Sequence, residues 1–232
     1  MAGEVGPGAT RGIAGWPAIP ESFAIGSAVV WVWKVENLAA HLDRSRLLTD
    51  ESFEPPYWAL VWSGSRHVAE RILPDLAVEG RRVLDVGCGL GLVAAAATVL
   101  GASVTAIDRS EVAIEFTQAT LAGLGVAPEA AICGDVRLLV GRPGYDLVVA
   151  AELLYEREAM PELAGVLLSL VEPGGELLVA DAHRVDTAPF YEALSARGAH
   201  LVAEQREALI EEGLPVRLRV TRWQVARSCG MG

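Results

Sequence analysis

Short apolar runs alternate with helix-forming segments along most of the chain. An apolar run of roughly four to eight residues, bounded by turn residues, is typical of a strand buried on both faces. Such runs predict parallel strands at residues 82–86, 101–108, 130–133, 145–151 and 176–180. Helices are predicted at residues 92–100, 110–124 and 187–197. Strands that alternate with helices in this way predict an α/β fold with a parallel sheet.

The C-terminal part of the chain departs from this alternation. Residues 199–206 and 215–225 have the pattern of two further strands, joined by a loop at Glu211-Glu212-Gly213. Two successive strands with no helix between them predict an antiparallel hairpin.

The N-terminal part has less regular patterning. Residues 28–35 have the β-branched and aromatic content of a strand, and helices are predicted at 38–42 and 65–73. Residues 1–24 are rich in Gly, Pro and Ala without apolar periodicity, which predicts a flexible leader. We therefore expect a single domain over residues 25–226 with an N-terminal strand and helix extension, followed by a disordered tail at 227–232.

Composition and charge exclude several classes of function. The formal net charge is -11 with a pI near 4.8. This charge disfavours nucleic acid as a partner and favours a basic or neutral substrate. The alternative is that the excess acid serves only solubility. The cysteines Cys88, Cys133 and Cys229 fit no zinc spacing, so we expect no metal. Their odd number, with no signal segment and no apolar run of membrane-spanning length, predicts a cytoplasmic protein without a membrane partner.

A glycine-rich turn follows the strand at 82–86 and leads into an alanine-rich helix. Strand, glycine turn and helix together allow backbone N–H groups to approach a nucleotide-like ligand. A dinucleotide fingerprint that starts at Gly87 requires its third glycine at position 92, which is a leucine. The acidic Asp85 precedes the turn, where it braces the turn or meets a positively charged ligand.

The sequence Asp85-Val86-Gly87-Cys88-Gly89-Leu90-Gly91 resembles motif I of the class I, seven-stranded S-adenosylmethionine-dependent methyltransferases. The resemblance implies a Rossmann-like, doubly wound seven-stranded sheet, mostly parallel, with a C-terminal antiparallel hairpin. It also implies S-adenosyl-L-methionine as the cofactor. Asp85, Gly87, Cys88, Gly89 and Gly91 are then expected in the cofactor site.

An aromatic segment ahead of motif I narrows the resemblance. Its Pro-Tyr-Trp-Ala-x-x-Trp-x-Gly pattern, at residues 56–64, resembles the protein-lysine branch that includes electron-transfer-flavoprotein β-subunit lysine methyltransferases. In one interpretation Trp62 and Gly64 line the cofactor pocket. In the other, the aromatic residues are a hydrophobic plug against the sheet.

Three further positions match cofactor contacts of the family. Asp108 ends the second parallel strand, where a carboxylate can accept hydrogen bonds from the ribose hydroxyls of the cofactor. Dehydrogenases bind their ribose in the same way, so Asp108 alone does not distinguish the two families. Arg109 then flanks the adenine or is a solvated surface residue. Asp135 and Val136 follow the third strand and would close the adenine pocket, with a plain turn as the alternative.

Candidate catalytic residues follow the fourth strand, because ligands of open α/β sheets bind at the carboxyl ends of strands. Here Ala151 leads into Glu152-Leu153-Leu154-Tyr155, which is similar to the acid-x-x-Tyr signature of the protein-lysine branch. This resemblance implies that Glu152 and Tyr155 orient the acceptor amine and take its proton; the alternative is that Glu152 only caps a helix. His183 is a weaker candidate general base, since a lone loop histidine is more often a surface residue.

The sequence therefore predicts an S-adenosylmethionine-dependent methyltransferase that N-methylates a protein lysine. A small-molecule N- or O-methyltransferase is the alternative, because acceptor specificity lies in variable loops of this fold. A nicotinamide dehydrogenase is disfavoured by Leu92, Asp85 and the terminal hairpin. A catalytically silent module of this fold that binds a partner is disfavoured by the complete cofactor pattern.

Overall fold

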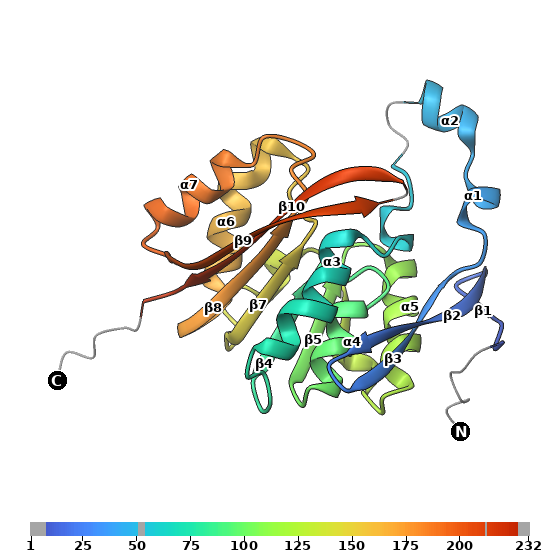
Figure 1. Ribbon diagram of the computed structural model, residues 1–232, viewed down its shortest axis with the longest axis horizontal. Coiled ribbons are helices and arrows are strands. Elements are labelled where there is room, and N and C mark those ends of the chain that lie inside the picture. The colour runs from blue at the N-terminus through green and yellow to red at the C-terminus, as the bar shows by residue number, and fades with distance from the viewer. Residues whose placement is uncertain (1–7, 51–53, 212, 227–232) are drawn as a thin grey trace.

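The computed structural model describes residues 8–50, 54–211 and 213–226. Its centre is a seven-stranded sheet with the strand order β6-β5-β4-β7-β8-β10-β9 (Figure 1). The strands are β4 (Arg82–Val86), β5 (Ser103–Asp108), β6 (Ala131–Cys133), β7 (Tyr145–Ala151), β8 (Val171–Asp181), β9 (His200–Glu211) and β10 (Leu214–Gln224). The first five run parallel, whereas β10 is antiparallel to β8 and to β9. The predicted mostly parallel sheet with a terminal antiparallel hairpin is therefore confirmed.

Helices cover both faces of this sheet. The helices α4 (Leu92–Val99) and α5 (Glu111–Ala122) cover one face, and α6 (Met160–Ser169) and α7 (Ala188–Ala196) cover the other (Figure 1). Successive side chains of a strand point to opposite faces, so Val83 enters the first core and Leu84 the second. Burial on both faces explains why these strands are nearly continuous apolar runs in the sequence.

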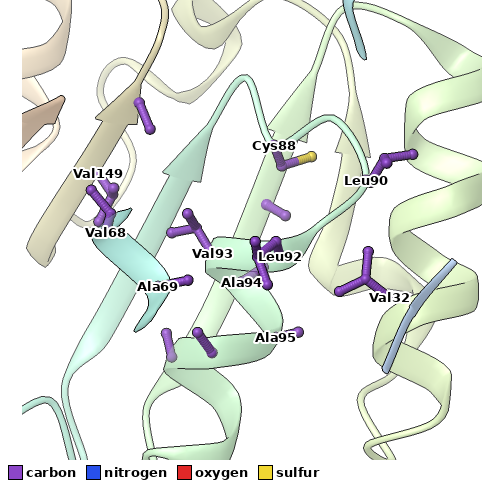
Figure 2. Close-up of a cluster of buried hydrophobic side chains, with 14 of the residues drawn as sticks. Val32, Val68, Ala69, Cys88, Leu90, Leu92, Val93, Ala94, Ala95 and Val149 are labelled. Atoms are coloured by element: carbon purple, nitrogen blue, oxygen red, sulfur yellow. The ribbon is translucent and has the colours of Figure 1, made fainter. Parts of the chain in front are cut away.

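Small side chains allow α4 to lie close to the sheet. Figure 2 shows Val93, Ala94 and Ala95 of α4 in one buried cluster with Val149 of β7 and Val68. Val68 begins a π-helical turn, η2 (Val68–Ile72), that continues α3 (Ser63–His67) and leads into the 3-10 turn η3 (Leu73–Asp75). The single helix predicted at 65–73 is thus a chain of three short segments.

The N-terminal region contradicts the expected flexible leader. Here β1 (Arg11–Ile13), β2 (Trp16–Ile25) and β3 (Ala28–Val35) form an antiparallel three-stranded sheet. The prolines and glycines suggested a leader, but Gly15 and Gly26 occupy the turns and Pro20 pairs with Trp33 within the sheet.

Burial explains the order of this N-terminal sheet. Ile13, Phe23 and Ile25 are buried in the same core as α4 and α5. The backbone N–H of Trp33 also donates a hydrogen bond to Thr120 Oγ1 of α5 at 3.2 Å. The earlier part of the expected leader, residues 1–7, and the expected tail, residues 227–232, lie outside the described residues.

The remaining elements are short. The helices α1 (Leu38–His41) and α2 (Arg44–Thr49) follow the N-terminal sheet, and the 3-10 turns are η1 (Tyr57–Ala59), η4 (Pro128–Ala130), η5 (Val136–Leu139) and η6 (Arg157–Ala159). Strand β8 begins before the predicted strand at 176–180, and its pairing with β7 passes from Tyr145–Val171 to Leu147–Glu176 across an irregularity. In the described ranges, every helix falls short of the length and apolarity needed to span a membrane.

Candidate active site

A cleft of about 1150 Å³ lies at the carboxyl ends of the parallel strands. From β4, the chain continues to β5 and β6 on one side of the sheet and to β7 and β8 on the other, so the strand order changes direction at this point. Ligands of open α/β sheets bind at such a point. The predicted site residues that line the cleft are Trp62, Asp85, Gly87, Cys88, Gly89, Asp108, Arg109, Asp135, Val136, Ala151, Glu152 and Tyr155. The fold therefore brings together most of the predicted site. Gly64 and Gly91 are not among the lining residues.

The glycine-rich loop has a backbone that other residues rarely adopt. Gly87, Gly89 and Gly91 all have positive φ, at 67°, 53° and 80°. The Gly89 N–H donates to Asp108 Oδ2 at 3.0 Å, which ties the loop to the end of β5. A Cβ at Gly89 would lie 3.0 Å from the Trp58 carbonyl oxygen, so the aromatic segment packs directly over the loop.

Gly64 and Gly91 shape the site without lining the cleft. Gly91 is the N-cap residue of α4, and a Cβ there would lie 3.0 Å from the Thr117 side chain. The Gly64 N–H donates to Glu152 Oε1 at 3.0 Å, and a Cβ at Gly64 would collide with that carboxylate. Both positions therefore require glycine because other chain segments approach closely.

Asp85 and Cys88 are buried around the base of the loop. Asp85 Oδ2 accepts a hydrogen bond from the Ala94 N–H at 3.0 Å, so this carboxylate braces the first turn of α4. Burial, with a smaller contribution from Asp108, raises the pKa of Asp85 to about 7. The Cys88 side chain belongs to the buried cluster of Figure 2, and burial raises the pKa of its thiol. Cys88 therefore contributes backbone to the cleft.

The acids after β5 and β6 are held by backbone N–H groups. Asp108 accepts from the Ser110 N–H through Oδ1 at 2.9 Å and from Gly89 through Oδ2. Asp135 caps η5 by accepting from the Arg137 N–H at 2.9 Å, and it also pairs with the Arg137 side chain. The hydrogen bond from the Arg137 N–H is the main reason that the pKa of Asp135 is lowered.

Glu152 is a buried carboxylate at the end of β7, with a side chain only 7% exposed. Its backbone has a positive φ of 61°, which is uncommon outside glycine and frequent at functional sites. It does not cap a helix, because the next helical turn begins at Arg157. Burial raises the pKa of Glu152 to about 7, although Arg184 and the Gly64 N–H oppose this shift.

Tyr155 lies at the mouth of the cleft. Its hydroxyl accepts a hydrogen bond from Arg109 Nη2 at 2.6 Å, which links the segment after β7 to the segment after β5. Burial raises the pKa of the Tyr155 hydroxyl, and the Arg109 charge opposes the shift. The predicted Arg109 and Tyr155 thus form one unit across the cleft.

The structure adds two site residues that were not predicted from the sequence. Arg184 Nη2 lies 3.6 Å from Glu152 Oε2 and 2.7 Å from Glu211 Oε2. Glu211, at the end of β9, also accepts from the Ser63 N–H at 2.9 Å. No local sequence pattern marks Arg184 as a partner of Glu152, or Glu211 as a partner of Ser63.

The two tryptophans of the aromatic segment, Trp58 and Trp62, both line the cleft but have different neighbours. The Trp58 ring packs 5.3 Å from the Phe116 ring and 5.7 Å from the Trp16 ring, measured between centroids. The Trp62 indole lines the cleft, and the Arg184 guanidinium lies 4.7 Å from its centroid. The contacts of Trp58 with other rings fit the hydrophobic-plug interpretation in part, and Trp62 lies where the pocket interpretation expects it.

His183 is not among the residues that line the cleft. Its Nδ1 lies 3.7 Å from Asp181 Oδ2, and its backbone N–H donates to Asp181 Oδ1 at 2.8 Å. The structure therefore favours its interpretation as a surface residue beside Asp181.

The residues around the loop fit S-adenosylmethionine. The backbone at Gly87 and Gly89 borders the cleft without side chains, and Asp108 is fixed by two N–H donors while each of its oxygens retains acceptor capacity. A carboxylate at this position can accept hydrogen bonds from the two neighbouring hydroxyls of a ribose.

Known proteins support this interpretation of the site. The family model described as "Methyltransferase domain" matches residues 61–229, which is most of the chain. The chain is 33% identical over 138 residues to the ubiquinone biosynthesis O-methyltransferase of Xanthomonas euvesicatoria, covering 58% of this chain and 55% of the relative. It is 31% identical over 137 residues to the electron transfer flavoprotein beta subunit lysine methyltransferase of Danio rerio, covering 57% and 52%. These matches span about half the length of the curated relatives.

Solved structures share the fold. The magnesium protoporphyrin IX methyltransferase of Synechocystis PCC 6803, with bound SAM, is 20% identical with a TM-score of 0.58, covering 70% of this chain and 78% of that one. A putative SAM-dependent methyltransferase from Streptococcus mutans has a TM-score of 0.63 at 13% identity, covering 89% and 55%. With the family match, the sheet order and the glycine-rich loop, these likenesses show that the chain belongs to the family of S-adenosylmethionine-dependent methyltransferases.

Proposed function

We propose that this protein transfers the methyl group of S-adenosylmethionine to the side-chain amine of a protein lysine. The observation that carries the proposal is the Glu152 carboxyl group, buried at the end of β7 in the wall of the cleft and followed three residues later by Tyr155. A free lysine amine has a pKa of about 10.4, so it must lose a proton before it can attack a methyl group. A buried carboxylate is suited to accept that proton.

The protein's residues have separate tasks in this mechanism. Asp108 would hold the ribose hydroxyls, and the backbone at Gly87 and Gly89 would allow close approach of the cofactor. S-adenosylmethionine supplies an electrophilic methyl group on a sulfonium. The chain must therefore orient the amine in line with that methyl group and exclude water.

Glu152 would take a proton from the acceptor ammonium, which frees the nitrogen lone pair for attack on the methyl group. A base works best when its pKa lies near the working pH, and the pKa of Glu152 is raised to about 7. Tyr155, held by Arg109, would orient the amine from the other side of the cleft opening.

The comparisons and the charge of the chain give further support. One of the relatives is named a lysine methyltransferase, and the Glu-x-x-Tyr sequence resembles the signature of that branch. The net charge of -11 favours a basic acceptor over nucleic acid.

A second candidate is a small-molecule N- or O-methyltransferase. It is favoured by the relative named a ubiquinone biosynthesis O-methyltransferase, and by a cleft of about 1150 Å³, large enough for a small-molecule acceptor as well as the cofactor.

Labelling separates the two candidates. The protein is incubated with S-adenosylmethionine that carries a labelled methyl group and with lysate from cells that lack this protein. We expect a labelled protein band that is absent when Glu152→Gln is used. A labelled small metabolite without a labelled protein would support the second candidate.

A further inference from the structure

One guanidinium in the wall of the cleft lies between two carboxylates. Arg184 Nη2 donates a hydrogen bond to Glu211 Oε2 at 2.7 Å. Glu152 Oε2 lies 3.6 Å from the same nitrogen, which is too far for a hydrogen bond. The Trp62 ring, 4.7 Å from the guanidinium, covers it from the side of the aromatic segment. Arg184 is therefore bound to Glu211 and only adjacent to Glu152.

Glu211 is fixed from two sides. It ends β9, and its Oε1 accepts a hydrogen bond from the Ser63 N–H at 2.9 Å while its Oε2 accepts from Arg184. Burial acts to raise the pKa of Glu211, but the hydrogen bonds from Ser63 and Arg184 outweigh it, so the pKa is lowered. Glu211 therefore stays ionised near neutral pH and keeps its hydrogen bond to Arg184.

Glu152 has the opposite balance of interactions. Burial raises its pKa to about 7, while the charge of Arg184 and the hydrogen bond from the Gly64 N–H oppose the rise. The negative charge of Glu211 adds to the rise. A movement of Arg184 from Glu211 towards Glu152 would therefore lower the pKa of Glu152.

Asp181 is the other charged group that acts on Glu152, and its negative charge also contributes to the raised pKa. The Asp181 Oδ1 accepts a hydrogen bond from the His183 N–H at 2.8 Å, and Arg219 lies opposite Asp181 in the pairing of β8 with β10. Asp181 thus acts on Glu152 through its charge, whereas Glu211 also competes with Glu152 for a shared cation.

We propose that Glu211 is a positioning residue for methyl transfer: it binds the Arg184 guanidinium and so keeps that cation from forming a hydrogen-bonded ion pair with Glu152. This inference rests on the proposed function, in which Glu152 is the base. A carboxylate that accepts a hydrogen bond from a guanidinium is a weaker base, because its charged form is stabilised. The C-terminal hairpin thereby keeps Glu152 able to take a proton near neutral pH.

The titration of Glu152 is measured directly by NMR. Protein labelled with ¹³C at the glutamate side-chain carboxyl groups is titrated with S-adenosylhomocysteine bound, and Glu152→Gln identifies the resonance. We expect Glu211→Gln to lower the proton affinity of Glu152 roughly tenfold, because Arg184 then turns to Glu152 and one negative charge is lost. Glu207→Gln removes the same charge from an exposed side chain earlier on β9 and should leave this titration unchanged.

An Arg184→Gln background separates the two causes. In this background no guanidinium is left to turn, so Glu211→Gln removes only the repulsion between two negative charges. Its effect on the proton affinity of Glu152 should be smaller than in the wild-type background. An equal effect in both backgrounds would show that repulsion acts alone, and would overturn the proposal that Glu211 acts through Arg184.

A second variant serves if Glu211→Gln does not fold. Glu211→Asp keeps the charge and shortens the side chain by one methylene group, which weakens its hold on Arg184. The proton affinity of Glu152 should then fall in the same direction but by less, and an unchanged affinity would overturn the proposal.

The failure of this proposal and that of the proposed function are distinguishable. An unchanged or higher proton affinity of Glu152 in Glu211→Gln overturns the role of Glu211 and leaves the proposed function standing. If the affinity falls, the pH profile of methyl transfer by Glu211→Gln should move to lower pH by the same amount. A profile that does not follow the NMR titration contradicts Glu152 as the base, and with it the proposed function.

Discussion

Glu152 has unusual properties at the level of a single residue. It combines a left-handed backbone, a buried carboxyl group and a pKa raised to about 7. Structural carboxylates are seldom held this way, whereas general bases commonly are. The lysine interpretation therefore depends on this position more than on any other.

Substitution at Glu152 and Tyr155 separates catalysis from cofactor binding. Glu152→Gln removes the charge and nearly preserves the shape, and Tyr155→Phe removes only the hydroxyl. We expect turnover to fall by roughly 10²–10⁴-fold for Glu152→Gln, and by less for Tyr155→Phe. The affinity for S-adenosylhomocysteine, measured by calorimetry, should change little in either variant. If Glu152→Gln instead lost cofactor affinity but kept full turnover at saturating cofactor, Glu152 would be a cofactor-binding residue and not the base.

The raised pKa of Glu152 predicts how activity depends on pH. Only the ionised carboxylate accepts a proton, so turnover should rise with pH and level off above about 7. A pH profile of kcat measures this rise, and Glu152→Gln should lack it. A wild-type profile that is flat from pH 6 to 8 would show that another group deprotonates the amine.

Asp85 has a raised pKa with consequences for stability. The pKa of this carboxyl group is about 7 in the folded protein, against an ordinary value of 3.8 that applies to the unfolded chain. Between these values the folded state binds more protons, so the free energy of unfolding falls as pH rises. Asp85→Asn keeps an oxygen for the Ala94 N–H and does not titrate. Relative to the wild type, this variant should gain stability from pH 5 to pH 8 in denaturant titrations. A constant difference would show that Asp85 ionises normally.

At the scale of elements, the aromatic segment at residues 55–64 combines packing and binding. Both tryptophans line the cleft, but Trp58 also packs against Phe116 and Trp16, whereas Trp62 lies beside Arg184. Trp58→Ala should therefore lower the free energy of unfolding by roughly 3–5 kcal/mol. Trp62→Ala should instead weaken cofactor binding and leave the melting temperature nearly unchanged. Thermal unfolding of the two variants, with and without cofactor, measures both effects. Equal destabilisation by Trp58→Ala and Trp62→Ala would show that Trp62 is also a core residue.

Elements with strong periodicity were predictable from the sequence, and those that depend on distant partners were not. The parallel strands and the terminal hairpin follow from apolar runs and turn residues. In the N-terminal sheet, the strand predicted at residues 28–35 is present as β3. The strands β1 and β2 were missed because Pro17 and Pro20 interrupt the pattern of β2, whose residues pack in the same core as α4 and α5. The link between Ser63 and Glu211 joins residues far apart in the chain and has no local signal.

At the scale of the whole molecule, the C-terminal hairpin, the aromatic segment and the segments after β7 and β8 meet at one end of the cleft. They are connected by the hydrogen bond from Ser63 to Glu211 and by the ion pairs of Arg184 with Glu211 and Glu152. These residues lie far apart in the sequence. The family motifs predicted most of the residues that line the cleft, whereas the charge network around them required the fold.

The central claim concerns the atom that receives the methyl group. Protein labelled in the lysate experiment is digested, and the methylated residue is identified by tandem mass spectrometry. The account predicts methyl groups on a lysine Nζ of the acceptor with the wild-type protein, and none with Glu152→Gln. Methyl groups found only on oxygen, or only on a small molecule, would contradict it.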